Sequence, residues 1–118
     1  MAIIEVINNT RKMKDKRIYG MFGPKIKAMR LEHGLKQRHL AELQGTDMPM
    51  YSKMELGGKA RRRDMIPKLT ELYKLNEHEF TTLWLADAVY ATLKSEEKKL
   101  QLDAIDLAKE NFKADEGL

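Results

Sequence analysis

Residues 34–57 read GLKQRHLAELQGTDMPMYSKMELG, and this stretch decides the fold. Its first half predicts a short helix, because Leu40, Ala41 and Leu43 lie on one face at helical spacing. Gly45 ends this helix, since a positive φ at that position is easily adopted only by glycine. The stretch therefore predicts a helix that stops at a tight turn.

The second half of the stretch predicts another short helix. Asp47 is a typical N-cap residue, and Pro49 suits the first turn, where a missing N–H group costs little. Tyr51 and Met54 follow Asp47 by four and seven positions, which gives this helix an apolar face. We expect the helix to span 48–55 and to end at the nearby glycines.

A third helix is expected before this pair. Phe22, Ile26 and Met29 have the spacing i, i+4, i+7, which is typical of one helix face. Pro24 fits the first turn and Gly34 fits the end. We therefore expect a helix of about three turns in front of the two short ones.

Three further helices are expected after the pair. Asp64 opens the first of them, which has Leu72 among its apolar residues. Asn76, followed three residues later by a glutamate, is typical of a capping box for a helix over 77–94. A charged helix over 95–113 ends the chain. No strand pattern follows residue 20, so the predicted fold class is all-α.

Composition restricts the class of protein. The chain has 118 residues, 42% of them hydrophobic and 34% charged, which fits one small globular domain with an appendage. Its apolar runs are far shorter than the ~20 residues of a membrane span, so we expect no membrane association. The first residues lack a signal-peptide pattern, and there are no cysteines for disulfides or thiolate metal sites. We expect a cytoplasmic protein.

Charge is unevenly distributed along the chain. Residues 1–67 carry fifteen Lys and Arg against seven Asp and Glu, a balance of +8, whereas residues 68–118 carry seven against eleven, a balance of −4. The basic excess lies in an N-terminal arm over 1–20, in scattered helix positions and in three consecutive arginines at 61–63. These cations predict a nucleic-acid surface if they converge, and solvated surface charge if they do not.

One set of residues carries a family resemblance. It comprises Gly23-Pro24-Lys25-Ile26, Arg30, Gly34-Leu35, Gln37, Leu40-Ala41, Leu43, Gly45, Ser52-Lys53-Met54-Glu55 and Gly57. In this register, residues 22–75 resemble the lambda-repressor-like, Xre/Cro-type helix-turn-helix family of DNA-binding proteins. The resemblance implies a five-helix domain whose second short helix enters the DNA major groove, here with an extra C-terminal helix and a basic N-terminal arm.

The resemblance also implies roles for single positions. Arg30 and Glu55 form a partly buried ion pair with a structural role. The positions that read base edges are Asp47, Met48, Pro49, Met50 and Lys53. The positions that contact the DNA backbone are Gln37, Lys36, Arg38, Ser52, Lys59, Arg61, Arg62 and Arg63. The implied function is a sequence-specific regulator of transcription, with repression favoured, at the nucleoid of a bacterial or phage-type system.

The base-reading positions depart from the usual pattern of that family. Its members mostly carry polar side chains there, whereas this chain has two methionines and a proline. Readout would rest on Lys53 at guanine O6 and N7 and on Met48 or Met50 against a thymine methyl group. The alternative is that Met50 packs inward and Met48 is merely exposed.

The helix over 77–94 is expected to be apolar on two faces. One face suits the core of residues 21–76, and the other is left for a partner. Helix-turn-helix modules normally bind two half-sites as pairs, so we expect a homodimer built from the C-terminal region, 77–118. The alternative is a monomer in which the helix over 95–113 covers the second face. The candidate interface residues are Leu85, Val89 and Leu93.

Other functions compete with DNA binding. The apolar surface at Met48, Pro49 and Met50 would also suit a protein-interaction module or an antitoxin that binds both a promoter and a protein partner. An enzyme is not expected, because the sequence has no metalloprotease, P-loop, dinucleotide-binding or nucleophile-elbow motif. No metal or cofactor is expected either.

Overall fold

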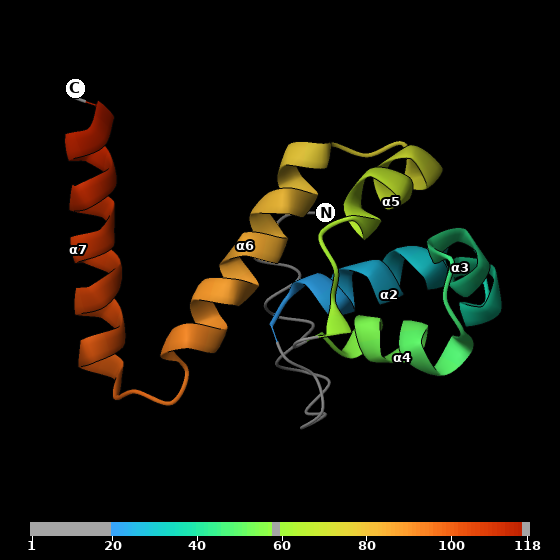
Figure 1. The fold of residues 1–118 in the computed structure, drawn as a ribbon, viewed down its shortest axis with the longest axis horizontal. Helices are drawn as coiled ribbons and strands as arrows, with labels where there is room; N and C mark the ends of the chain where they lie inside the picture. The colour runs from blue at the N-terminus through green and yellow to red at the C-terminus, as the bar shows by residue number, and fades with distance from the viewer. Residues whose placement is uncertain (1–19, 58–59, 117–118) are drawn as a thin grey trace.

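The computed structural model describes residues 20–57 and 60–116, and the elements in these two ranges are six α-helices. They are α2 (Phe22–Glu32), α3 (Gln37–Gln44), α4 (Met48–Leu56), α5 (Met65–Tyr73), α6 (Glu77–Leu93) and α7 (Lys98–Glu116), labelled as in Figure 1. No strand occurs in the described ranges, which confirms the all-α class. None of the described helices is long and apolar enough to cross a bilayer.

The helix ends agree with the capping residues of the sequence. Gly45 follows α3 with a φ of +66°, in the left-handed region that favours glycine. At the start of α4, Asp47 Oδ1 accepts a hydrogen bond from the Met50 N–H group at 2.8 Å. At the start of α6, Asn76 Oδ1 accepts from the Glu79 N–H group at 3.1 Å. The predicted turn and the N-caps at Asp47 and Asn76 are confirmed, with only the Asn76 half of the predicted capping box formed. Asp64 precedes α5 as predicted but forms no side-chain capping bond.

Five helices, α2 to α6, supply the core of the described residues. The rings of Phe22 and Phe80 meet edge to face with centroids 6.0 Å apart, which packs α2 against α6. Gly23 brings α2 close to α4, because a Cβ atom at this position would overlap the carbonyl oxygen of Glu55. The fully buried apolar side chains include Phe22, Ile26, Leu40, Tyr51, Met54, Met65, Ile66 and Leu69.

Two apolar residues are more exposed than their spacing predicts. Leu43 on α3 and Leu72 on α5 share a predicted face with core residues, yet both side chains are exposed to solvent. Helices α3 and α5 are only eight and nine residues long. Such a short helix presents about two turns, so only its most central apolar positions are covered by neighbouring helices.

The last helix differs from its predicted span. It begins at Lys98 rather than at Ser95, and it runs to Glu116. The cause lies at the end of α6, where the chain reverses (Figure 1). There Gln101 Nε2 donates a hydrogen bond to the Leu93 carbonyl oxygen at 2.9 Å. This bond satisfies an end carbonyl of α6 and leaves the intervening residues as a loop.

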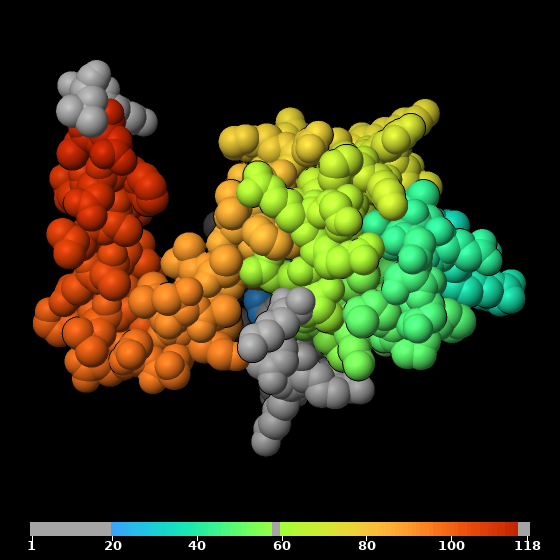
Figure 2. Space-filling view, viewed as in Figure 1, coloured from blue at the N-terminus to red at the C-terminus, as the bar shows by residue number. Residues whose placement is uncertain are grey.

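Helix α7 stands apart from the other helices. Figure 1 shows α3 and α4 at one end of the molecule and α7 at the opposite end, and in Figure 2 α7 protrudes from the body. Among the described residues, the main helix–helix contacts are those that the five helices from α2 through α6 make with one another, and none of them involves α7. A groove of about 350 Å³ lies between α6 and α7. The large apolar side chains that α7 exposes are Leu100, Leu102, Leu107 and Phe112.

Candidate nucleic-acid interface

A buried ion pair fixes α4 against α2. Arg30 Nε lies 2.7 Å from Glu55 Oε2, and Arg30 Nη2 donates to Glu55 Oε1 at 3.1 Å. The two side chains are 10% and 3% exposed. The hydrogen bond to Glu55 raises the pKa of Arg30, although burial opposes this shift. The bidentate geometry gives the pair directional rigidity as well as charge pairing.

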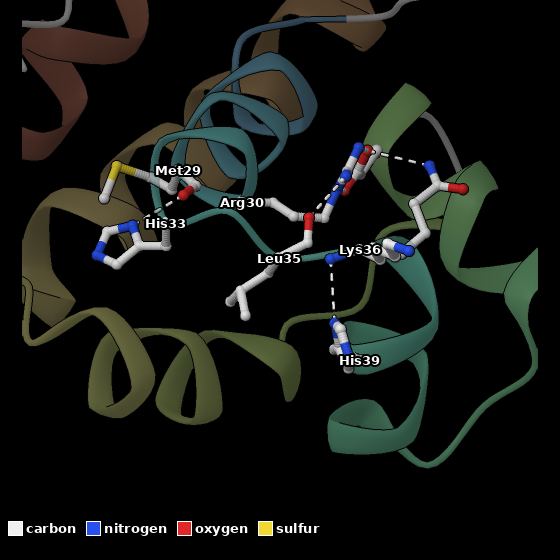
Figure 3. A network of polar contacts seen from close by, with 8 residues as sticks. Met29, Arg30, His33, Leu35, Lys36 and His39 are labelled. Carbon is white, nitrogen blue, oxygen red and sulfur yellow. Dashed lines mark hydrogen bonds and ion pairs between the residues drawn. The ribbon is translucent and has the colours of Figure 1, made fainter.

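The same pair also fixes the start of α3. Arg30 Nη1 donates to the Leu35 carbonyl oxygen at 3.1 Å, a contact visible in Figure 3. Gln37 Nε2, in the first turn of α3, donates to Glu55 Oε1 at 3.2 Å. Three helices therefore converge on one guanidinium and one carboxylate. Removing either charge would leave its partner buried and unpaired, which typically costs about 3–5 kcal/mol.

The side chain of Gln37 belongs to this network, because its amide group donates a hydrogen bond to Glu55. It was assigned a DNA-backbone contact by the family resemblance, and the structure places it half-buried against Glu55. One of its amide hydrogens is therefore used inside the protein. The second hydrogen and the amide oxygen form no hydrogen bond with the described residues, so a phosphate contact remains open to them.

Three cations lie on the exposed side of α3 and α4. Lys36, Arg38 and Lys53 are all exposed. Lys36 sits at the N-terminal end of α3, where its backbone N–H group donates to His39 Nδ1 at 3.1 Å (Figure 3). Ser52 is half-buried on α4. The hydrogen bond between Gln37 and Glu55 places the start of α3 beside the end of α4, so these cations lie away from the turn between the two helices.

The first turn of α4 is exposed and largely apolar. Met48 is 49% and Met50 is 40% exposed, so the alternative in which Met50 packs inward is wrong. Pro49 is exposed as well. The Asp47 carboxylate accepts the Met50 N–H group, which commits one of its oxygens to capping the helix. Among the positions assigned to base reading, Lys53 is therefore the one long polar side chain without such a commitment.

The three arginines between α4 and α5 differ in burial and in the residues that they contact. Arg61 Nη1 donates to the Trp84 carbonyl oxygen at 2.7 Å, and the Arg61 guanidinium lies 4.3 Å from the Trp84 ring centroid. Burial lowers the pKa of Arg61. Arg62 Nη2 donates to the Gln44 carbonyl oxygen at 3.1 Å and is exposed, as is Arg63. Arg62 Nε also lies 3.3 Å from Asp64 Oδ1, and the Arg63 guanidinium lies 5.9 Å from the Trp84 ring centroid. Arg61 therefore joins its loop to α6, whereas Arg62 and Arg63 keep exposed guanidinium groups beside these contacts.

Two groups assigned to DNA contact lie outside the described residues. They are Lys59, within the gap at 58–59, and the basic N-terminal arm, within 1–19. The candidate surface consequently rests on α3, α4 and the two exposed arginines.

Asp87 is a site that sequence reasoning missed. It is 4% exposed and accepts hydrogen bonds from the N–H groups of Met21 at 2.7 Å and Phe22 at 2.9 Å. It thus caps α2 from the distant helix α6. Burial raises the pKa of Asp87, while these two hydrogen bonds and the charge of Arg61 oppose the shift. The sequence contains one indication of this role, since Asp87 is the single acid in the apolar part of α6 and buried acids usually have a bonding partner.

The predicted dimer residues share one side of α6. Leu85 and Val89 are 45% and 50% exposed, and Leu93 is half-buried beside the groove to α7. Their spacing of four residues aligns them along the helix. Val89 and Leu93 line the groove between α6 and α7, and Leu85 and Val89 stay about half exposed, so α7 covers this face only in part.

Comparison of the chain with protein-family models, curated proteins and solved structures finds no match. Within the described ranges, no group of three or more His, Asp or Glu residues is placed to hold a metal ion.

We expect Asp87→Ala to lower the free energy of unfolding by about 1–3 kcal/mol, because two N–H groups of α2 lose their acceptor. Since the pKa of Asp87 is raised on folding, its contribution is complete below the ordinary pKa of 3.8 and declines as pH rises through the folded value. Urea unfolding between pH 3 and 8, followed by circular dichroism, measures both effects.

Glu71→Ala is the matched control, because Glu71 is an exposed acid on α5, outside the proposed dimer interface. It should leave the free energy of unfolding unchanged. A difference between wild type and Asp87→Ala that grows with rising pH would contradict the assignment.

Proposed function

We propose that the protein is a sequence-specific regulator of transcription that binds double-stranded DNA through a helix-turn-helix, with α4 in the major groove. The observation that carries this proposal is the two-sided character of α4. Its inner side, with Tyr51, Met54 and Glu55, is buried, and its outer side is exposed from Met48 to Lys53. An α-helix held in this way is the element that fits the major groove of B-DNA.

The geometry before α4 supports the same function. Only the three residues Gly45–Asp47 separate α3 from α4, and the φ of +66° at Gly45 allows the abrupt change of direction. In a helix-turn-helix, the first helix crosses the DNA backbone while the second contacts base edges. Lys36 and Arg38 at the start of α3 are then the cations nearest to phosphate.

Arg62 and Arg63 extend this basic surface beyond α4. Both are exposed and follow α4 in the chain. Phosphate contacts fix the position of a protein on DNA without reading its sequence. We therefore assign to these two arginines the second backbone contact and to Arg61 the role of anchoring their loop to α6.

The proposed DNA-bound form is a homodimer. Its interface comprises the exposed side of α6 and helix α7. A 19-residue helix is marginally stable when it packs on nothing, and α7 exposes four large apolar side chains. α6 and α7 have 17 and 19 residues. A strip about 10 Å wide along both amounts to roughly 500 Å² per partner, which is close to the ~1,000 Å² in total that a specific interface needs.

Charges on α7 favour an antiparallel arrangement of two copies. Its first turn contains Lys98 and Lys99 and no acid, which is unfavourable next to the positive end of the helix dipole. Residues 103–115 carry four acids and two lysines. A second α7 running in the opposite direction would place its acidic part beside these lysines. Repression is the favoured mode, because a DNA-bound dimer blocks access to the site that it covers.

A protein-interaction module or an antitoxin is the second candidate. It is favoured by one observation, the exposed apolar side chains of Met48 and Met50. Methionine suits surfaces that adapt to protein partners. DNA binding is the preferred proposal because exposed cations lie near these methionines, Lys53 on α4 and Arg62 beside the end of α3. An apolar docking site does not require such cations.

We expect binding to duplex DNA to weaken steeply with salt, since each phosphate contact contributes about −0.9 to the slope of log K against log salt. Replacing Arg62 and Arg63 together by alanine should reduce the magnitude of this slope by roughly 1 to 2. Fluorescence anisotropy with a labelled duplex, at four or more salt concentrations, measures the slope.

Lys68→Ala is the control for this experiment, because Lys68 is an exposed cation on α5, outside the proposed DNA contacts and dimer interface. It should not change the slope. Arg61→Ala should lower thermal stability, since Arg61 is bonded to α6. Salt-insensitive binding, or an unaltered slope after removal of Arg62 and Arg63, would contradict the phosphate assignment.

We expect Val89→Glu to convert the dimer to a monomer, because the new carboxylate would be buried between two copies of α6. Sedimentation velocity gives the mass directly. Leu72→Glu, an equivalent change at an exposed leucine of α5, should leave the dimer intact. If Val89→Glu sediments as a dimer, this face is not the interface.

A further inference from the structure

We propose that the first turn of α4 recognises the C5-methyl group of pyrimidines in the major groove, which thymine and 5-methylcytosine share. The inference rests on the proposed function and names the chemistry that α4 would read. Met48 and Met50 would supply the contact, and Lys53 would supply the adjacent polar contact.

The first turn of α4 has few side chains that are free to form hydrogen bonds with DNA. The Asp47 carboxylate accepts the Met50 N–H group at 2.8 Å, so it serves the helix. Pro49 has neither a polar side chain nor an N–H group. Met48 and Met50 expose about half of their surface and can form only weak hydrogen bonds through sulfur. The exposed first turn therefore offers DNA a surface that is mainly apolar.

The major groove presents one apolar group to such a surface. Base edges there carry hydrogen-bond donors and acceptors, and thymine adds the C5-methyl group. A methionine placed over a polar edge would remove water without replacing its hydrogen bonds, which is unfavourable. Over a methyl group the same side chain buries apolar surface on both molecules. The contrast between these two outcomes provides discrimination against unmethylated pyrimidines.

Lys53 adds a polar contact on the same face. It follows Pro49 by four residues in α4, which puts both on one side of the helix. Its side chain is exposed and has no partner among the described residues. An ammonium group there can donate to guanine O6 or N7. The expected half-site therefore contains methyl-bearing pyrimidines next to a guanine.

The charge around this apolar turn favours DNA as its occupant. Lys53, three residues after Met50 on α4, is exposed, and the exposed Arg62 bonds the carbonyl oxygen of Gln44, four residues before Met48. Phosphates flank the bases on both sides of a major groove, so cations beside an apolar reader match the arrangement of DNA charge. A purely apolar protein partner would bury these cations without compensation.

The test removes single methyl groups from the DNA. Starting from the duplex bound best out of a random pool, each thymine is replaced in turn by deoxyuridine, which lacks only the methyl group. We expect affinity to fall about fourfold for each methyl group that is contacted. In a second arm, cytosine at a sensitive position should bind worse than 5-methylcytosine by a similar factor.

Protein variants assign the effect to its residues. Met48→Ala and Met50→Ala should lose the distinction between thymine and deoxyuridine at separate positions, whereas Lys53→Ala should keep it. Because both methionines are exposed, the variants should fold, and circular dichroism checks this. Leu72→Ala, an exposed apolar residue on α5, is the matched control and should keep the distinction.

The possible outcomes separate this inference from the proposed function. Specific binding that is indifferent to every deoxyuridine substitution would overturn methyl recognition and leave DNA regulation standing. Loss of the distinction in Lys53→Ala but not in the methionine variants would also overturn it. Absence of any sequence-specific binding by the folded wild-type chain would overturn both, and a protein ligand released by Met48→Ala would then identify the turn as a protein-docking site.

Discussion

The ion pair between Arg30 and Glu55 is the interaction on which the rest of the structure depends. It joins α2 to α4 through two hydrogen bonds, and Arg30 also holds the Leu35 carbonyl oxygen before α3. Both side chains are shielded from water, so neither can move without leaving a charge unpaired. The absence of a side chain at Gly23 brings the two helices together at the same place. The outer side of α4 is thereby held in one orientation.

A second set of contacts connects this unit to the C-terminal helices. Asp87 of α6 caps the start of α2, and Arg61 binds the Trp84 carbonyl oxygen on the same helix. The arginine loop and α2 are therefore both fixed to α6. If α6 and α7 form the proposed dimer, these contacts set the distance and orientation between the two copies of α4. Protein symmetry would then determine the spacing of the DNA half-sites.

Local signals allowed much of the fold to be predicted from sequence. Gly45, Asp47 and Asn76 each act within a few residues, and the structure agrees with all three. Helix spacing predicted the helices themselves, although Leu43 and Leu72 are exposed and the last helix begins three residues later than expected. Contacts between distant segments were not predictable in the same way. Asp87 caps a helix that begins 65 residues earlier, and Arg61 binds Trp84 rather than solvent. The chain reversal between α6 and α7 is held by Gln101, which bonds the carbonyl oxygens of Leu93 and Glu96, and spacing alone does not reveal these bonds.

Selection of bound sequences from a random pool of duplex DNA tests the central claim most directly. The full chain is mixed with the pool, the bound duplexes are amplified through several rounds, and the enriched sequences are read. A fixed α4 on each copy of a symmetric dimer predicts a consensus of two inverted half-sites about one helical turn apart. A folded protein that enriches no sequence would contradict the account, and a single unpaired half-site would contradict the dimer.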